Sequence, residues 1–493
     1  MRSHLETTVL ESSAIDLAHH ALNVAQHCGA KYADVRVTRY LRQNIMCEDE
    51  RVSGITDSED IGFGVRVLVN GAWGFAGSNG LVNEEVERVA RQAVEIAMAS
   101  ASPLRDPVRL VHEAARQSEF RSSCNINPFT VPVEQKVSLL LEVDRRMLKF
   151  VEIKKAESRM SLRRDERIFA SSEGSLLQSD LFVTSAVCRA TAVGDGDAQS
   201  RTYEPPPLSM GYENIDAASL LANADRIAEQ AIAKLRSQQS PIGLKDLILD
   251  PHNLALTIHE SVGHATELDR ALGMEESLAG RSFATPDKLN SLRYGSPLIN
   301  FVADNTLQHG LATWGSDDDG VEGQRWHIVA DGVFRGYSTS REVAGEIGLE
   351  RSTGGCRADH WSSIPIVRIP NLSLAPGRQP LSLEELIADT DDGIYIEGMG
   401  SFSIDQMRCN FQFGGDAFWE IKGGRIVGML KNVTYQSITP KFWNSCDAIC
   451  DARFWVPNGV LNCGKGDPMQ INRMTHGASP ARFRNVAVGA ARV

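Results

Sequence analysis

The sequence predicts an α+β fold in which an N-terminal mixed α/β domain precedes a C-terminal domain rich in β-strands. Three observations support this prediction. The 493 residues are enough for two or more domains of about 100–200 residues each. Helix-like and strand-like segments alternate in the first half, whereas glycine-turn hairpins are more frequent in the second. A polar segment with Pro and Gly, 237–246, separates the halves, so we place the boundary there, between 1–240 and 241–493.

The first half is expected to contain both helices and strands. The strand-like run GFGVRVLVNGAWGFAG contains Asn70-Gly71, a pair that readily adopts the positive φ angles of a tight hairpin turn. A second strand-like region, 153–203, has a turn at 172–174. Apolar residues at helical spacing predict four helices, at 12–27, 84–99, 133–149 and 216–236.

The second half is expected to be built mainly from hairpins. Asp331-Gly332 and Gly423-Gly424 each lie between two strand-like runs, which predicts hairpins at 328–337 and 417–430.

The composition excludes several classes of protein. Hydrophobic residues at 42% and charged residues at 23% exclude wholesale disorder, and a formal net charge of -12 argues against direct nucleic-acid binding. No apolar run approaches the ~18 residues of a membrane span, and the N-terminal sequence lacks the apolar stretch of a signal peptide. Nine scattered cysteines, an odd number, indicate reduced thiols. We therefore expect a cytoplasmic protein without a membrane span.

One segment of the second half combines helix signals with chemically reactive side chains. Asp250 can accept hydrogen bonds from a helix start, and Pro251 suits the first helical position. His259, Glu260 and His264 are then expected to lie on one buried helix. Its buried face would be formed by residues at helical spacing, namely Leu254, Ile258, Val262 and Ala265.

The two histidines are five residues apart, whereas zinc peptidases of the H-E-x-x-H type have them four apart. At about 100° per residue, five residues on a regular helix would leave the imidazoles about 140° apart. They could then not share one metal. We therefore predict a one-residue π-bulge between His259 and His264, and Gly263 is where the backbone could distort at least cost.

With that bulge, the motif predicts zinc chemistry. Two neutral imidazoles would bind Zn²⁺, a third protein ligand would be needed, and a water would occupy the fourth position. Glu260 would take a proton from the water as it attacks a carbonyl and would pass the proton to the leaving amine. On the residues alone, an amphipathic helix with two unrelated polar histidines remains an equal alternative.

Several segments of the chain resemble the TldD/PmbA family of metallopeptidases. These are GFGVRVLVNGAWGFAGSN, HESVGHATELD, GGDAFWEIKGGRIVGMLKNVTY and NCGKGDPMQ. Because the chain keeps H-E-x-x-x-H, it is similar to the TldD-like branch, and TldE/PmbA-like partners lack that motif. One departure is Ala265, where family members often have Gly.

The resemblance implies further features of the site and the assembly. It implies that Cys463 is the third zinc ligand, and that the C-terminal β-rich domain carries the metal-binding helix. It also implies a dimer, either a homodimer or a heterodimer with a TldE/PmbA-like subunit. From the residues alone, Lys465 would favour a Cys463 thiolate, but a buried apolar role for this cysteine is also open.

Other polar residues could also take part in the site. Glu267 and Asp269 either hold a histidine N–H or are exposed helical charges. The run Asp317–Asp319 lacks two ligands of a calcium loop, which favours a solvated turn. Cys446 and Cys450 are expected in the core. Three basic residues near a likely strand could contact a substrate carboxylate or oxyanion, or lie at the surface: Arg357, His360 and Arg368.

The sequence as a whole predicts a zinc-dependent metallopeptidase that hydrolyses unfolded or small peptides. Glu260 is the predicted general base, and the predicted ligands are His259, His264 and Cys463. An extended peptide could pair with a strand edge of either predicted hairpin. The alternative is a non-catalytic peptide-binding or scaffold subunit of a TldD/TldE-type complex, and the intact Glu260 argues against it. A structural zinc site would normally have four protein ligands.

Overall fold

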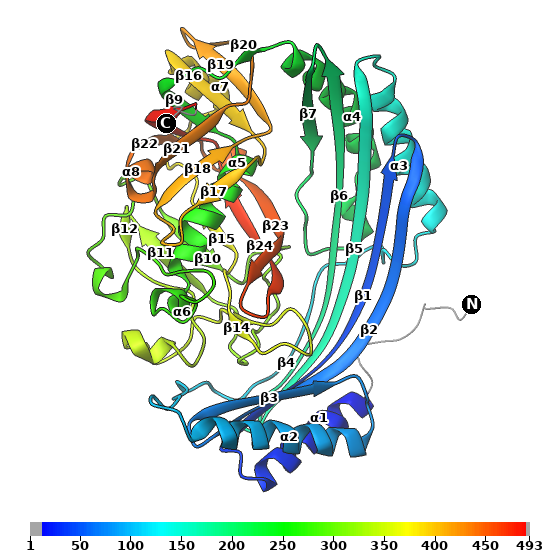
Figure 1. The fold of residues 1–493 in the computed structure, drawn as a ribbon, viewed down its shortest axis with the longest axis vertical. Coiled ribbons are helices and arrows are strands. Elements are labelled where there is room, and N and C mark those ends of the chain that lie inside the picture. The colour runs from blue at the N-terminus through cyan, green and yellow to red at the C-terminus, as the bar shows by residue number, and fades with distance from the viewer. Residues whose placement is uncertain (1–11, 490–493) are drawn as a thin grey trace.

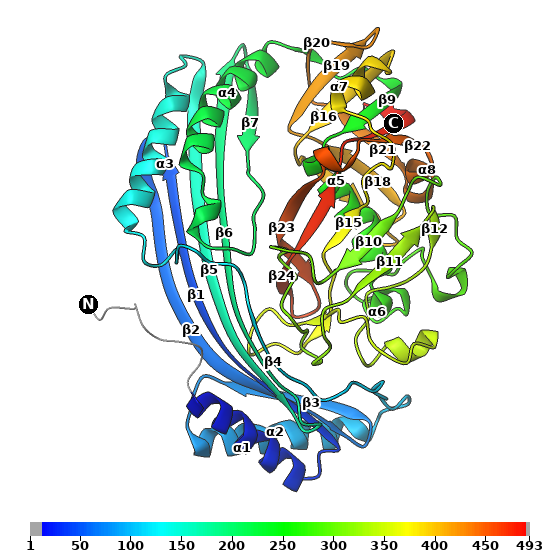
Figure 2. The same cartoon turned by 180° about the vertical axis from the view of Figure 1, so that it is seen from behind.

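The computed structural model describes residues 12–489 and shows a mixed α/β, strand-rich protein. A tall, curved sheet from the first half of the chain faces a strand-rich body from the second half (Figure 1). The same arrangement is visible from behind (Figure 2). The predicted division at 237–246 stays a prediction.

The helices and strands of the first half are long. The helices are α1 (Ser12–His27), α2 (Asn83–Ala101), α3 (Val133–Leu148) and α4 (Ala217–Leu235). The strands are β1 (Tyr32–Glu48), β2 (Arg51–Val69), β3 (Ala72–Ser78), β4 (Gln117–Arg121), β5 (Ile153–Ser171), β6 (Leu176–Gly194) and β7 (Asp197–Tyr203).

The elements from residue 238 onward are shorter. The helices are α5 (Pro251–Ile258), α6 (Leu268–Ala271), α7 (Leu383–Ala388) and α8 (Thr439–Asn444). The strands are β8 (Gln238–Gln239), β9 (Gly243–Leu249), β10 (Phe301–Asp304), β11 (Arg325–Ala330), β12 (Val333–Phe334), β13 (Cys356–Arg357), β14 (Ile366–Val367), β15 (Leu372–Leu374), β16 (Asp392–Glu397), β17 (Phe402–Ile404), β18 (Asn410–Gly414), β19 (Ala417–Lys422), β20 (Arg425–Lys431), β21 (Thr434–Ile438), β22 (Cys446–Ile449), β23 (Val456–Lys465), β24 (Gln470–Ala478) and β25 (Ala481–Val488). Among them, β8 lies before the predicted boundary at 240 but pairs with β20.

The seven strands of the first half form one sheet with the order β3-β2-β1-β5-β6-β4, and β7 pairs with β6. Neighbouring strands are antiparallel, apart from the parallel pair β4 and β6. The predicted turn at Asn70-Gly71 is confirmed, because both residues have positive φ angles, 50° and 80°. All four predicted helices are present, each within two residues of its expected ends.

Two apolar clusters support this sheet. The helices α1 and α2 pack against β1, β2 and β3 at one end, and α3 and α4 pack against β5 and β6 at the other (Figure 1). The sheet is thus covered by helices near its two ends.

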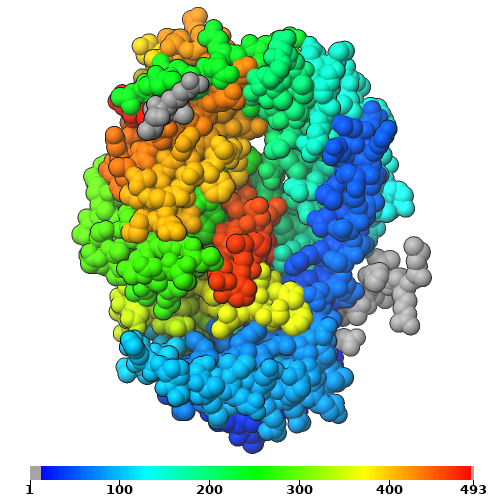
Figure 3. Space-filling view, viewed as in Figure 1, coloured from blue at the N-terminus to red at the C-terminus, as the bar shows by residue number. Residues whose placement is uncertain are grey.

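The second half builds a ten-stranded sheet, a four-stranded sheet and two hairpin-like strand pairs. Both predicted hairpins are present, as β11–β12 and β19–β20. The strand β9 lies between β25 and β16 in the ten-stranded sheet, and α5 begins directly after it. The pair β23–β24 lies against α5. In the space-filling view, this orange-red pair lies between the body and the blue strands of the curved sheet (Figure 3).

A large apolar core surrounds α5. The four positions expected on the buried face all have exposed fractions of 0%: Leu254 and Ile258 in α5, and Val262 and Ala265 in the two turns that follow it. The helix that carries the motif is therefore held on several sides. No helix within residues 12–489 is both long enough and apolar enough to cross a membrane.

Candidate metal centre

The helix α5 starts as the sequence predicted. Asp250 lies at its N-cap, where the Asn253 N–H donates to the Asp250 carboxylate at 2.6 Å, and Pro251 opens the helix. The same carboxylate oxygen accepts from the Gly398 N–H at 3.0 Å, which ties the helix start to the end of β16.

The predicted π-bulge is confirmed. Residues His259–Gly263 form a π-helical turn, and the His264 N–H donates to the His259 carbonyl, five residues earlier. This extra residue brings the two imidazoles to the same side, with ring centroids 4.8 Å apart.

The reason that we gave for Gly263 is wrong. Its φ of -54° is an ordinary right-handed helical value, so the turn needs no glycine flexibility there. Packing is the actual requirement. A Cβ atom at this position would lie 2.8 Å from the Ile369 Cδ1 atom, closer than two carbon atoms can approach.

His259, His264 and Cys463 converge from two distant parts of the chain. Their nearest potential ligand atoms all lie within 4.8 Å of one another, and the Cys463 Sγ is 3.4 Å from the His264 Nε2. Cys463 belongs to β23, whose pairing with β24 shifts register between Val460 and Cys463. Such an irregularity re-aims a side chain, here toward the π-turn.

Hydrogen bonds determine which nitrogen of each histidine is free. The His476 Nδ1 lies 2.9 Å from the Leu372 carbonyl, and a carbonyl only accepts, so this nitrogen donates. The His476 Nε2 must then accept from the His259 Nδ1, at 2.8 Å. The His259 Nε2 therefore keeps a lone pair for a metal.

His264 is oriented in a similar way by a carboxylate. Its Nδ1 donates to the Glu267 Oε2 at 2.7 Å, as expected for one of the two acids, which leaves the His264 Nε2 as the acceptor. Burial lowers the pKa of both His259 and His264, so both imidazoles are neutral at pH 7, the form that binds metals.

Asp269 and Lys465, which were also expected to assist the site, bind each other instead of the predicted ligands. The Asp269 carboxylate accepts from the Lys465 Nζ at 2.8 Å, and it makes no hydrogen bond to a histidine of the described residues. That ammonium also donates to the Val367 carbonyl at 2.7 Å and lies 3.2 Å from Glu267. Lys465 is therefore neutralised by carboxylates, and its predicted role in activating the Cys463 thiol is not supported.

Glu260 lies beside the cluster and has a partner that the sequence did not indicate. Its Oε2 accepts from the Arg408 Nη1, and no hydrogen bond from the described residues reaches its Oε1. The Glu260 side chain is 7% exposed. One carboxylate oxygen is thus held by a cation and the other remains available.

The donor set fits a divalent metal such as zinc. Two neutral imidazole nitrogens and one sulfur are typical zinc donors, and three protein ligands leave a position for water or substrate. Both imidazoles are oriented through their second nitrogen, as metal-ligating histidines usually are.

Several other expectations are corrected. Asp317, Asp318 and Asp319 are at most 4% exposed, so they are not a solvated turn. The Asp319 and Asp318 carboxylates pair with arginines of the curved sheet, Arg66 and Arg167, whereas the Asp317 carboxylate accepts from backbone N–H groups. Such long-range pairing leaves no sequence pattern.

The three basic residues that we considered for substrate contact do not share one environment. Arg357 and Arg368 are at most 2% exposed and donate to backbone carbonyls, so neither lies at the surface nor reaches a substrate. His360 pairs with Asp60 of β2 at 2.5 Å. Cys446 and Cys450 are buried in two different apolar clusters, as core packing predicted.

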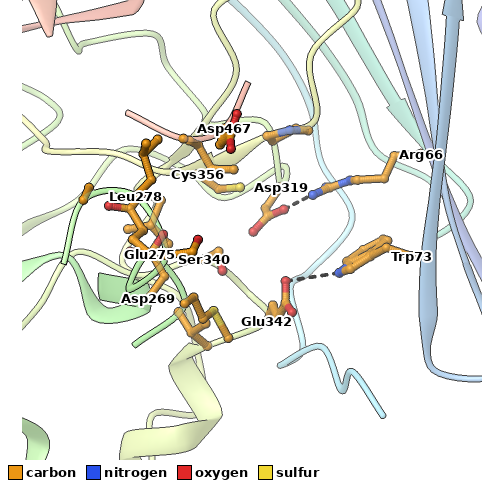
Figure 4. Close-up of a pocket in the computed structure, with 18 residues that line it drawn as sticks. Arg66, Trp73, Asp269, Glu275, Leu278, Asp319, Ser340, Glu342, Cys356 and Asp467 are labelled. Carbon is orange, nitrogen blue, oxygen red and sulfur yellow. Dashed lines mark hydrogen bonds and ion pairs between the residues drawn. The ribbon is translucent and has the colours of Figure 1, made fainter. Parts of the chain in front are cut away.

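A cavity of about 280 Å³ lies between the curved sheet and the body (Figure 4). Across it, Arg66 pairs with Asp319 at 2.8 Å and the Trp73 indole N–H donates to Glu342 at 3.1 Å. Its lining includes Asp269 but, among the described residues, none of the three converging side chains or Glu260. The cavity is therefore separate from the candidate metal centre.

Sequence reasoning missed two residues of the site, His476 and Arg408. His476 stands in no motif, and only the pairing of β24 with β23 places it behind His259. Arg408 lies in the turn between β17 and β18 and has a positive φ of 60°. No local sequence pattern predicted this turn or its contact with Glu260.

Known proteins match most of the chain in sequence. Sequence models of the PmbA/TldA metallopeptidase match at 33–97 (domain 1), 126–238 (central domain) and 243–490 (C-terminal domain). A metalloprotease of Methanocaldococcus jannaschii is 30% identical over 81% of this chain and 85% of its own length. A zinc metalloprotease TldD homolog of Saccharolobus solfataricus is 24% identical over 94% and 98% of the two chains.

Solved structures share the fold. A protein of Thermotoga maritima described as a candidate modulator of DNA gyrase superposes with a TM-score of 0.77 at 15% identity, over 97% of this chain and 100% of its own. TldE from Thermococcus kodakarensis superposes with a TM-score of 0.73 at 15% identity, over the same shares. The sequence matches and the converging side chains together lead to one conclusion: the chain belongs to the PmbA/TldA metallopeptidase family, which is the TldD/PmbA family that its motifs predicted.

Proposed function

We propose that this protein is a zinc-dependent peptidase in which His259, His264 and Cys463 hold the metal. The observation that carries the proposal is the convergence of these three side chains within 4.8 Å, with Glu260 beside them on the same π-turn. The name of the Saccharolobus solfataricus relative, a zinc metalloprotease, supports the choice of metal.

The residues of the chain would divide the work as follows. Zinc, when bound, would polarise the scissile carbonyl and make a water molecule more acidic. Glu260 would accept a proton from that water on its free Oε1 and deliver it to the departing amine nitrogen. His476 and Glu267 would keep the histidine rings in the ligating orientation.

We propose unfolded or small peptides as substrates, since an extended backbone can pair with a strand edge without a fixed sequence. The candidates for that pairing are the outer edge of β12 and, on β20, residues 425–429, because β8 already pairs with Leu430 and Lys431. We also propose a dimer, formed either by two copies or with a TldE/PmbA-like subunit, as the family resemblance implies. Nine unpaired cysteines support a reducing, cytoplasmic location.

Replacing the proposed general base tests the mechanism. Glu260→Gln should keep bound zinc near the wild-type level and lower kcat for an unfolded peptide by at least about 10²-fold, because a carboxamide cannot take the proton. Zinc content by plasma mass spectrometry and cleavage by chromatography are the measurements.

His259→Ala, His264→Ala and Cys463→Ala are the matched metal-site variants, and each should lose zinc and activity together. Wild-type turnover by Glu260→Gln would refute the proposed mechanism. A zinc-loaded wild type that binds unfolded peptides but cleaves none would favour the alternative, a binding or scaffold subunit.

A further inference from the structure

Arg408 stands beside Glu260 with hydrogen-bond donors to spare. An arginine has five N–H donors, and within residues 12–489 only Nη1 is engaged, by the Glu260 carboxylate. The Arg408 Nε is buried and, among the described residues, has no hydrogen-bond partner. The side chain is 15% exposed, and no hydrogen bond from the described residues occupies its Nη2 donors.

The backbone around Arg408 is held firmly in an unfavourable conformation. Its φ of 60° is in the left-handed region, which is uncommon for arginine. The Arg408 N–H donates to the Asp405 carbonyl at 2.9 Å, and the Thr439 hydroxyl donates to the Arg408 carbonyl at 2.8 Å. Strain maintained in this way at a site is often linked to function, because it aims a side chain.

Other cations near the site cannot reach a substrate. Lys465 is buried and bound to Asp269 and Val367. Arg368 is fully buried and donates to the carbonyls of Cys463 and Gln470. Among these three cations of the described chain, Arg408 is therefore the one that combines partial exposure with unused donors.

We propose that Arg408 donates to the oxyanion that forms on the scissile carbonyl, and this inference rests on the proposed peptidase function. In the first step, the water oxygen bonds to the carbonyl carbon, one water proton passes to Glu260, and the π-electron pair of the carbonyl moves onto its oxygen. In the second step, that pair returns, the C–N bond breaks, and Glu260 gives the proton to the nitrogen.

The position of Arg408 suits this role. The oxyanion and the oxygen from water are bonded to the same carbon, so a donor that touches the base lies within reach of the oxyanion. A charged donor that is already in place stabilises the transition state without reorganisation. The contact of Arg408 with Glu260 would also keep the second carboxylate oxygen directed at the water.

The first test uses Arg408→Gly, because glycine suits the positive φ and so removes the guanidinium without straining the turn. We expect kcat to fall about 10²–10³-fold, the usual cost of losing an oxyanion donor, with KM changed less than about threefold and zinc content unchanged. Added guanidinium at millimolar concentration should restore part of kcat. Met407→Ala, an exposed neighbour in the same turn, is the matched control and should behave as the wild type.

The second test is a binding measurement that does not depend on turnover. A phosphinic peptide of alanine and phenylalanine resembles the tetrahedral anion, and its affinity by calorimetry should fall about 10²-fold in Arg408→Gly. Arg408→Lys should lose less, because it keeps the charge. Unchanged phosphinate affinity, or a loss confined to KM, would overturn the proposal.

Two further outcomes separate the competing explanations. If Arg408 instead bound the terminal carboxylate of a peptide, amidation of the substrate would raise KM in the wild type and abolish the effect of Arg408→Gly, and that result would overturn the oxyanion role. If the wild type cleaves no peptide, or Glu260→Gln cleaves normally, the proposed function fails. The oxyanion role then fails with it, whereas normal cleavage by the wild type, loss of cleavage in Glu260→Gln and unchanged phosphinate affinity in Arg408→Gly would overturn the role of Arg408 alone.

Discussion

At the residue scale, the chemistry of the site depends on which nitrogen of each histidine is free. A backbone carbonyl, that of Leu372, determines the protonation of His476, and His476 determines that of His259. The Glu267 carboxylate does the same for His264. The histidine lone pairs are therefore directed by groups that would never touch the metal.

Removing the His476 acceptor tests this chain of hydrogen bonds. His476→Phe leaves the His259 Nδ1–H without its partner, so zinc affinity should fall about 10–100-fold, as for other groups that orient a ligand. Competition with a chelator of known affinity measures the change. His360→Phe, at the contact with Asp60, is the control and should keep wild-type affinity. Equal affinities for both variants would contradict the role of His476.

At the element scale, the π-turn is the feature that converts a five-residue spacing into one site. It brings the His259 and His264 rings to the same side. The Ile369 side chain, which packs against Gly263, keeps the turn in place. Helix propensity alone predicts that Gly263→Ala would stabilise the helix by about 0.5–1 kcal/mol. The packing against Ile369 predicts the opposite sign.

We expect Gly263→Ala to destabilise the protein by about 1–3 kcal/mol and to weaken zinc binding, because the new Cβ displaces the turn from Ile369. Thermal unfolding and chelator competition measure both effects. The double variant Gly263→Ala/Ile369→Ala shortens the side chain that the new Cβ would meet. Its zinc affinity should therefore be higher than that of Gly263→Ala alone. Gly428→Ala, where a Cβ would meet nothing within 4 Å, is the control. A more stable Gly263→Ala variant would show that packing is not the constraint.

At the scale of the whole molecule, buried ion pairs fasten the curved sheet to the body that carries the site. Arg66 of β2, 4% exposed, pairs with Asp34 at 2.7 Å and with Asp319 of the body at 2.8 Å. Arg167 of β5 similarly pairs with Asp318 at 2.6 Å. Each arginine stabilises a carboxylate that would otherwise be buried and unpaired.

Arg66→Met should therefore lower stability by about 3–5 kcal/mol, because it leaves Asp34 and Asp319 as uncompensated buried charges. Differential scanning calorimetry would record this as a lower Tm. Arg88→Met removes a surface pair with Glu85 and should leave Tm close to the wild-type value, which makes it the matched control. Similar Tm values for the two variants would show that the interface pairs contribute little.

Much of the local structure was predictable from the sequence. Helical and strand periodicities, glycine turns and the helix cap at Asp250 depend on residues close together in the chain, so they are visible in the order of residues. The π-turn belongs to the same group, since five-residue spacing of two ligands on one helix leaves few geometrical solutions.

Only the tertiary structure decided the surroundings of the site. His476 is 217 residues from His259, and Arg408 is 148 residues from Glu260. Lys465, near Cys463 in sequence, turned toward carboxylates instead. Spacing along a chain records which neighbours share one helix face or one turn. It does not show which distant strands and loops come into contact once the core has formed. Those long-range contacts orient the side chains of the site.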